Sequence, residues 1–340
     1  MRTPLQGGLP PAGAVAGPVV EIACDESGFS GTNLLDPSTP MITHASVDLS
    51  AGEAGQLIAE LRSSSHELKS GPFLRGPRAG EALELFLGAL RGRALVHLID
   101  KEFFLVTRVI DLLLAEPSYA AGTRLTQDRR PAAVALHRAL RAAGEDGKAF
   151  LVSFTDLVRV KRRQPANQAV ERFLRARDAL AGDRARETPA GDRAEETPAG
   201  ERAQPTPVGE QARKMPAGIT EERVRDLLTR LDDDDRTIPP PLEPLLPALA
   251  ETVLFWSEGR RRVLVTHDEQ SALTADRLTR LQQALAVGGV SPLAGLIMVD
   301  SRDDPRVQLA DLLAGVARRS PRSAGLRPLI SRTSLLPDLW

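Results

Sequence analysis

The stretch "VVEIACDESGFSGTN" (residues 19–33) decides how we interpret the fold. It starts with an apolar run of strand-forming residues, which predicts a buried strand. Two acids, Asp25 and Glu26, end this strand directly before Ser27 and Gly28, and a Ser-Gly pair is typical of a turn. Neighbouring strand residues point to opposite faces, so both acids can face one site only if the turn kinks the chain. We expect such a kink here.

The bulk composition is typical of a globular protein. The chain has 340 residues, enough for one large domain with an insertion or for two domains, and 42% of them are hydrophobic. A formal net charge of −1 argues against a protein that coats polyanions over its whole surface. A local basic surface is still compatible with this charge.

Cysteine content and apolar runs indicate the compartment. Cys24 is the only cysteine, so no intramolecular disulfide can form, and a reducing compartment is the simpler setting. No apolar run approaches the roughly 18 residues that a membrane helix needs. We therefore expect a cytoplasmic protein without membrane contact.

Strand and helix patterns alternate on both sides of a long middle segment. Besides the first strand, apolar runs predict strands at 40–49, 93–101, 261–268 and 293–300, and helical spacing predicts helices at 80–92, 102–116, 270–286 and 305–319. This alternation predicts an α/β domain with a mixed sheet.

The middle segment, residues 119–249, has a different composition. Its apolar spacing predicts several helices, and a nine-residue unit is repeated four times over 181–216, beginning with "AGDRARETP". The repeat has almost no large apolar residue, so ordering it would cost conformational entropy without burying apolar surface. We expect a helical insertion with a disordered linker at the repeat, and a disordered tail at 1–18, which is rich in Gly, Pro and Ala.

Four of the predicted strands end in an aspartate. These are Asp25, Asp100, Asp268 and Asp300. In an open α/β sheet the carboxyl ends of the strands form the crevice where ligands bind, and carboxylates gathered there repel one another unless a cation lies among them. Mg²⁺ or Mn²⁺ would suit an all-oxygen site. The alternative is that each acid simply begins a solvated loop.

Asp311 lies inside a predicted helix rather than after a strand. On the helical wheel it shares a side with Gln308 and Gly315, opposite the apolar stripe. It is either part of an ordinary solvent-facing side or, if the helix packs beside the strand ends, a further ligand of the metal.

Several motifs together resemble a known family. In chain order they are "CDESG" (24–28), "HELKSGPF" (66–73), "LIDK" (98–101), "VTHDEQ" (265–270) and "VDSRDDPRVQLADLLAG" (299–315). This order is similar to that of domain of unknown function 3800. The resemblance implies a ribonuclease H-like fold: an α/β structure with a mixed β-sheet flanked by helices, interrupted here by a helical and partly disordered insertion.

The resemblance also implies a domain plan. The core would comprise residues 19–118 and 250–320, with the insertion at 119–249 between them and a C-terminal tail at 321–340.

Roles at the metal site follow from the same resemblance. It implies that Asp25, on the first strand, is the primary metal ligand and that Asp100 and Asp311 complete the catalytic set. Asp300 and Asp268 match the family's "DS" and "DEQ" motifs and are further metal-ligand candidates.

Residues beside these acids are candidates for substrate binding. They are Glu26, Ser27, Lys69, Lys101 and Gln308. Each lysine could hold a phosphate group, although Lys69 could equally form an exposed ion pair. Basic runs at 159–163 and 259–262 could follow a nucleic-acid backbone, but no aromatic residues interleave them to stack on bases.

Two functions of different classes follow. The first is a divalent-metal-dependent nuclease in which a metal-activated water hydrolyses a phosphodiester. The second is a non-catalytic binding module of the same fold that acts with nucleic acid or with a protein partner recruited by the insertion. A phosphate-binding ATPase of the actin or sugar-kinase type ranks last, because its glycine typically follows the strand-end acid by two positions, whereas Gly28 follows Asp25 by three.

Overall fold

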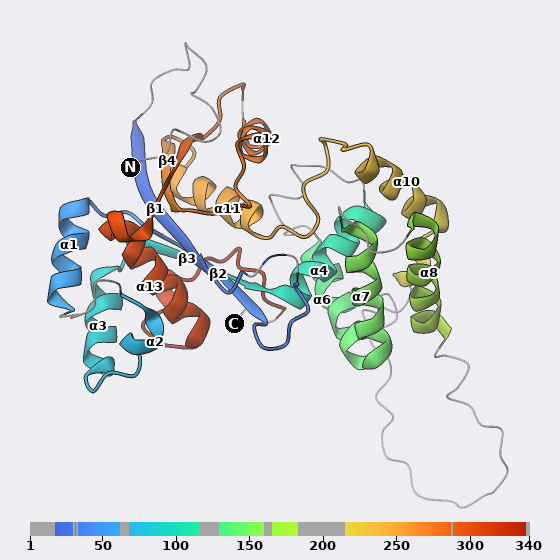
Figure 1. The fold of residues 1–340 in the computed structure, drawn as a ribbon, viewed down its shortest axis with the longest axis horizontal. Helices are drawn as coiled ribbons and strands as arrows, with labels where there is room; N and C mark the ends of the chain where they lie inside the picture. The colour runs from blue at the N-terminus through green and yellow to red at the C-terminus, as the bar shows by residue number, and fades with distance from the viewer. Residues whose placement is uncertain are drawn as a thin grey trace, which may run out of the picture. The chain divides into compact units, whose positions relative to one another are not determined.

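The chain folds into two compact units. The computed structural model describes residues 18–29, 31, 33–61, 68–115, 129–159, 165–182, 215–286 and 288–337. The first unit comprises Met1–Phe104, Ser118–Leu125 and Glu243–Trp340, and the second comprises Leu105–Pro117 and Thr126–Leu242 (Figure 1). The expected disordered tail and repeat linker fall almost entirely outside the described residues, so both stay predictions.

A five-stranded sheet forms the centre of the first unit. Its order is β3-β2-β1-β4-β5, and its strands are β1 (Val19–Ser27), β2 (Met41–Val47), β3 (Ala94–Asp100), β4 (Arg262–Asp268) and β5 (Leu293–Val299). β2 runs antiparallel to both of its neighbours, whereas β1, β4 and β5 are parallel. The predicted mixed α/β sheet is confirmed, and β1, with Asp25 and Glu26 near its end, is the central strand.

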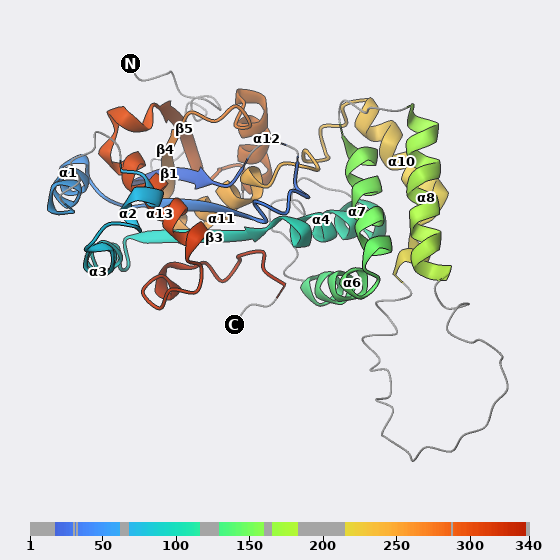
Figure 2. The ribbon, with the colours of Figure 1, turned by 60° about the horizontal axis from the view of Figure 1, so that its bottom comes forward.

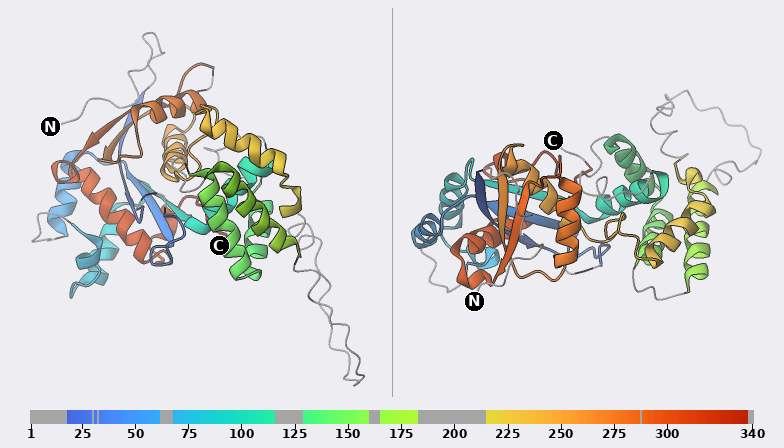
Figure 3. Two further views of the ribbon diagram at one scale, coloured as in Figure 1. Left: turned by 45° about the vertical axis from the view of Figure 1, so that its right-hand side comes forward. Right: turned by 90° about the horizontal axis from the view of Figure 1, so that it is seen from above.

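Helices cover both faces of this sheet (Figure 2 and Figure 3). One face carries α13 (Pro305–Arg319), with α1 (Ala51–Glu60), α2 (Ser70–Phe73) and α3 (Ala79–Ala89) beside it. The other face carries α11 (Leu245–Ser257) and α12 (Ala275–Leu285). Alternate residues of β1 and β3 therefore enter two separate cores, as the two-residue period of a strand requires.

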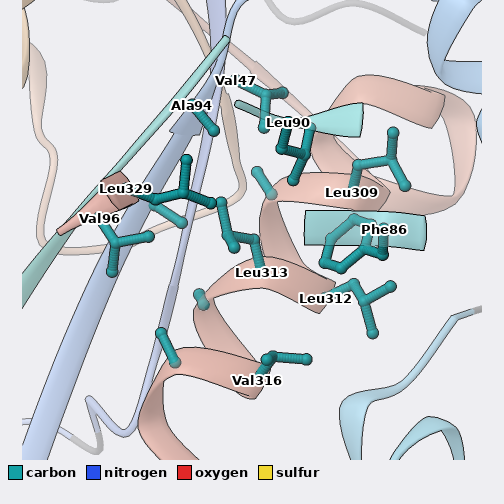
Figure 4. Close-up of a cluster of buried hydrophobic side chains, with 14 of the residues drawn as sticks. Val47, Phe86, Leu90, Ala94, Val96, Leu309, Leu312, Leu313, Val316 and Leu329 are labelled. Carbon is teal, nitrogen blue, oxygen red and sulfur yellow. The ribbon is translucent and has the colours of Figure 1, made fainter. Parts of the chain in front are cut away.

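The sequence explains why α13 begins and packs as it does. Asp304 caps the helix by accepting from the backbone N–H of Arg306, and Pro305 occupies the first turn, where a missing N–H does no harm. An apolar stripe, formed by Leu309, Leu312, Leu313 and Val316, packs against the sheet and α3 (Figure 4). Burial of this stripe fixes which side of α13 faces the strands.

The segment after α13, which the sequence assigned to a tail, lies in part along the edge of the sheet. After η5 (Arg327–Leu329), the N–H of Ser331 donates to the carbonyl of Val96 and that of Leu335 to the carbonyl of Leu98, both in β3. These bonds satisfy backbone groups of an edge strand that would otherwise be open to another chain.

The second unit is helical, and it overlaps the segment 119–249 that the sequence assigned to an insertion. Its elements are the end of α4 (Lys101–Val109), η1 (Ile110–Leu114), α6 (Arg130–Ala142), α7 (Glu145–Val158), α8 (Ala166–Gly182), η3 (Pro216–Gly218) and α10 (Glu221–Asp232). Phe150 and Phe154 of α7 contact Phe173 of α8 in its core. Gly147 is required where α7 meets α6, because a Cβ there would lie 2.0 Å from the carbonyl oxygen of Leu140.

None of the helices in the described part of the chain combines the length and the hydropathy that crossing a membrane would take.

Candidate functional site

Two of the predicted acids lie side by side where β1 and β4 end. These strands are parallel, and their last recorded pair is Cys24 with His267, so Asp25 and Asp268 come next in register. Adjacent strands are about 4.8 Å apart, which makes the two aspartates direct neighbours. Ala23 belongs to the core on the α13 face, and Asp25 shares that face because it is two residues further along.

Helix α13 brings a third acid to this place. The side chain of Asp311 is near enough to Asp25 to affect its charge, and it accepts a hydrogen bond from Lys69 Nζ at 2.9 Å. The close approach of the elements depends on Gly315, one turn after Asp311, since a Cβ at this position would lie 2.2 Å from Ser70 Oγ. Thr43 Oγ1 of β2 also donates to the carbonyl of Ala314 at 2.7 Å, which ties α13 to the sheet.

Asp25 has a strongly perturbed carboxyl group. Its side chain is 4% exposed, and burial raises its pKa to about 9, with the negative charges of Glu26, Asp311 and Asp268 adding to the shift. The hydrogen bond that Asp25 Oδ1 accepts from the backbone N–H of Glu26, at 2.7 Å, acts in the opposite direction. At neutral pH Asp25 therefore keeps a proton unless a cation takes its place.

Asp268 lies beside Asp25 with one oxygen already engaged. Its Oδ1 accepts from the backbone N–H of Ser301 at 2.9 Å, in the loop after β5. This bond orients the carboxylate without neutralising it.

Asp100 does not join these acids. Across β2, Ala45 pairs with Asp25 on one side and with Val96 on the other, so the β3 residue level with Asp25 is Val96. Asp100 comes four residues later and two strands away, which places its Cα about 16 Å from that of Asp25. This is too far for one ion to bind both carboxylates. Asp100 instead caps α4, accepting from the backbone N–H of Phe103 at 2.8 Å.

Asp300 also has a local role. Its carboxylate accepts from the backbone N–H of Arg302 at 3.0 Å and pairs with the Arg302 guanidinium, capping η4 (Ser301–Asp303). The bonds from Arg302 hold the pKa of Asp300 below its usual value. The structure therefore brings together Asp25, Asp268 and Asp311 and leaves Asp100 and Asp300 outside.

Glu26 faces the other side of the sheet. β1 stays paired with β2 as far as Ser27, and the positive φ of +90° that marks the turn occurs only at Gly28. The expected kink thus comes too late to place both acids on one face. Glu26 accepts from Gln270 Nε2, and its other oxygen lies 3.9 Å from Nε2 of the buried His267.

Glu243 lies near Glu26 on this opposite face. Burial raises the pKa of Glu243 to about 7, and the Glu26 charge adds to that shift. No pattern in the sequence around Glu243 singles it out, because it is a single acid within a proline-rich stretch.

The remaining substrate-binding candidates have local partners. Ser27 Oγ accepts from Arg318 Nε at 2.9 Å, and Gln308 donates to the carbonyl of Arg302 at 3.3 Å. Lys101 is buried and donates to Thr39 Oγ1 at 3.1 Å, and its burial lowers its pKa. Lys69 forms the partly exposed ion pair with Asp311 already described.

The basic runs of the sequence are only partly described. In the second run, Arg260 and Arg261 share one carboxylate, Glu258, which offsets one of the three positive charges of the run. Most of the first run lies outside the described residues. Arg318 and Arg319, by contrast, lie beside Ser27 and Ser70.

The three acids offer a hard cation only oxygen ligands. Asp25, Asp268 and Asp311 suit Mg²⁺ or Mn²⁺ by donor type. The raised pKa of Asp25 shows that its ionised form would be poorly compensated by the protein alone. In the ranges that the structure describes, however, no three or more His, Cys, Asp or Glu side chains are arranged as a ready metal site. To bind the ion, Asp311 would have to give up its ion pair with Lys69.

Comparison with known proteins returns no match to a family model, a curated protein or a solved structure.

Proposed function

We propose that this chain is a ribonuclease H-like nuclease that hydrolyses phosphodiesters with Mg²⁺ or Mn²⁺ bound by Asp25, Asp268 and Asp311. The observation that carries the proposal is the convergence of these acids from β1, β4 and α13 around a carboxyl group whose pKa is raised to about 9. The position of Asp25 on the central strand agrees with the resemblance noted in the sequence.

Each protein group has a distinct part in this proposal. Asp25, Asp268 and Asp311 would hold the ion through their carboxylates, with Asp25 releasing its proton to solvent and Asp268 kept oriented by the Ser301 N–H. Lys69, now paired with Asp311, would be the nearest cation for a phosphate oxygen of the substrate. A bound divalent ion would supply activation of the attacking water and stabilisation of the leaving oxygen.

Cleavage assays test this function directly. The wild-type chain should cleave at least one of single-stranded RNA, single-stranded DNA or an RNA–DNA hybrid in Mg²⁺ or Mn²⁺. Asp25→Asn and Asp268→Asn should each lower the rate by about 100-fold or more, since removal of one carboxylate removes an ion ligand while keeping the side-chain shape. Asp300→Asn, in an acid that pairs with Arg302 of its own loop, is the matched control and should cleave like wild type.

Equal rates for wild type, Asp25→Asn and Asp268→Asn would remove the proposal. So would a complete lack of metal-dependent cleavage of all three substrates.

A second function is favoured by the Lys69–Asp311 ion pair. The ammonium group already neutralises one of the three acids, and a proton on Asp25 neutralises another, so the fold can exist without a cation. A non-catalytic module that binds nucleic acid or a protein partner would show this arrangement. Calorimetry with Mn²⁺ separates the two functions, because only the nuclease requires binding at millimolar concentrations or below.

A further inference from the structure

Two neighbouring arginines end α13 beside the candidate acids. Asp311, Gly315 and Arg318 follow one another at helical spacing and share one side of the helix. Arg318 is partly buried: its Nε donates to Ser27 Oγ at the end of β1, and its Cδ would lie 2.8 Å from a Cβ at position 28. Gly28 therefore makes room for this side chain.

Arg319 turns to the neighbouring element. Its Nε donates to Ser70 Oγ at 3.3 Å, and one of its terminal nitrogens would lie 3.6 Å from a Cβ on Gly71. The guanidinium of Arg75 would be 3.7 Å from the same point. Because Ser70 follows Lys69, which binds Asp311, this cationic group is continuous with the acid cluster.

The positive charges of this group are poorly compensated. Within the described residues, no carboxylate lies at ion-pair distance from Arg75, Arg318 or Arg319. Burial and the neighbouring Arg319 lower the pKa of Arg318, so the two guanidinium groups repel each other. Favourable contact with the helix C-terminus explains one exposed arginine, but not a partly buried Arg318 beside an exposed Arg319, each bound to a serine hydroxyl.

The distance to the acids suits a substrate that touches both groups. Ser27 lies two residues after Asp25 on the same face of β1, or about 6.6 Å along the strand. An anion bound by Arg318 would therefore lie close enough to Asp25 to be the phosphate next to a phosphodiester held there. Guanidinium groups bind phosphate oxygens with two parallel hydrogen bonds, and each arginine here already uses Nε, leaving its terminal nitrogens for a ligand.

We propose that Arg318 and Arg319, oriented by Ser27 and Ser70, bind a backbone phosphate of a nucleic-acid strand next to the one held at Asp25. The inference rests on the proposed function, since it names the contact that would place the strand across the acids. It assigns Arg318 and Arg319 the role of positioning residues that bind substrate away from the reacting phosphate.

Fluorescence anisotropy tests this site separately from cleavage. The probe is a 5′-fluorescein-labelled 12-mer, as RNA and as single-stranded DNA, titrated with the full chain in EDTA over a range of salt concentrations. The double variant Arg318→Gln/Arg319→Gln should raise Kd at least tenfold. It should also reduce the slope of log Kd against log salt by about 0.7, because the two arginines bind one phosphate and each phosphate contact on a single strand contributes about 0.7.

Three further variants control for charge and folding. Arg91→Gln/Arg327→Gln removes two exposed arginines elsewhere in the same unit and should change Kd less than threefold. Arg318→Lys/Arg319→Lys keeps the charge but not the paired hydrogen bonds and should lie between wild type and the Gln variant. Arg319→Gln alone alters an exposed side chain, so it keeps the test valid if Arg318→Gln impairs folding.

Failure of this inference is distinguishable from failure of the proposed function. Arginine-dependent binding by a chain that cleaves nothing would support the phosphate site and contradict the nuclease. Cleavage that depends on Asp25, together with a wild-type Kd in the double variant, would support the nuclease and contradict the phosphate site. The inference is also overturned if the wild type does not bind either probe, or if the Arg91/Arg327 control weakens binding equally.

Discussion

Asp25 is a residue of the candidate site whose charge is hard for the protein to accommodate. It is buried, it has three acidic neighbours, and it receives a hydrogen bond from only one backbone N–H in the described structure. A proton or a cation must therefore offset its charge. Because a cation displaces the proton, cation affinity should increase with pH and cation binding should release a proton.

The raised pKa of Asp25 predicts a pH dependence of stability. The folded-state pKa is about 9 and the unfolded value is 3.8, so between these limits the folded state binds a proton that the unfolded state does not. In EDTA, this group therefore lowers the free energy of unfolding as pH rises from about 4 to about 9. Its contribution is most favourable below pH 4.

Thermal unfolding of wild type and Asp25→Asn in EDTA measures this effect. The variant should have a Tm several degrees above wild type at pH 8, and the difference should shrink towards pH 4, because Asn keeps the acceptor for the Glu26 N–H without carrying a charge. A Tm difference that is constant across this pH range would show that Asp25 titrates normally.

At the scale of elements, α13 determines how the site is assembled. One side of the helix enters the core through Leu309, Leu312, Leu313 and Val316, and the side beside it carries Asp311, Gly315 and Arg318. The close contact between Gly315 and Ser70 holds α2, and with it Lys69, against Asp311. Packing and site geometry therefore depend on the same helix.

Gly315→Ala should disturb both the packing of α13 and the geometry of the site. A Cβ at this position would lie 2.2 Å from Ser70 Oγ and 2.6 Å from Ser70 Cβ, so α2 must shift, and we expect a loss of about 1–3 kcal/mol in chemical denaturation. Gly88→Ala in α3, where a Cβ meets nothing within 4 Å, is the matched control and should be neutral or stabilising by up to about 1 kcal/mol. Adding Ser70→Gly to Gly315→Ala should restore most of the loss. Equal stability of the two single variants would contradict this packing account.

The elements could be predicted from the sequence, but their register could not. The apolar runs predicted at 40–49 and 93–101 form β2 and β3, and the helix predicted at 305–319 has the bounds of α13. That Asp100 ends a strand follows from local pattern. Its distance from Asp25 depends on how β2 pairs with both neighbours, and side chains far apart in the chain determine that pairing. For the same reason, the partnership of Asp268 with Asp25 required the β1–β4 register.

At the scale of the whole molecule, the candidate site belongs to one unit. Asp25, Lys69, Asp268 and Asp311, together with Arg318 and Arg319, all lie in the unit that contains the sheet. The helical insertion contributes none of these residues. The expectation that the insertion recruits a protein partner stays a prediction, and it can be pursued without altering the acids.

The central claim is that Asp25, Asp268 and Asp311 bind one divalent cation together, without Asp100. Isothermal titration calorimetry with Mn²⁺ tests it most directly, in two buffers of different ionisation enthalpy at pH 7. We predict binding to wild type with release of close to one proton, a Kd at least tenfold higher for Asp25→Asn and Asp268→Asn, and an unchanged Kd for Asp100→Asn. Wild-type affinity in Asp25→Asn, or a loss of binding in Asp100→Asn equal to that in Asp268→Asn, would contradict the account.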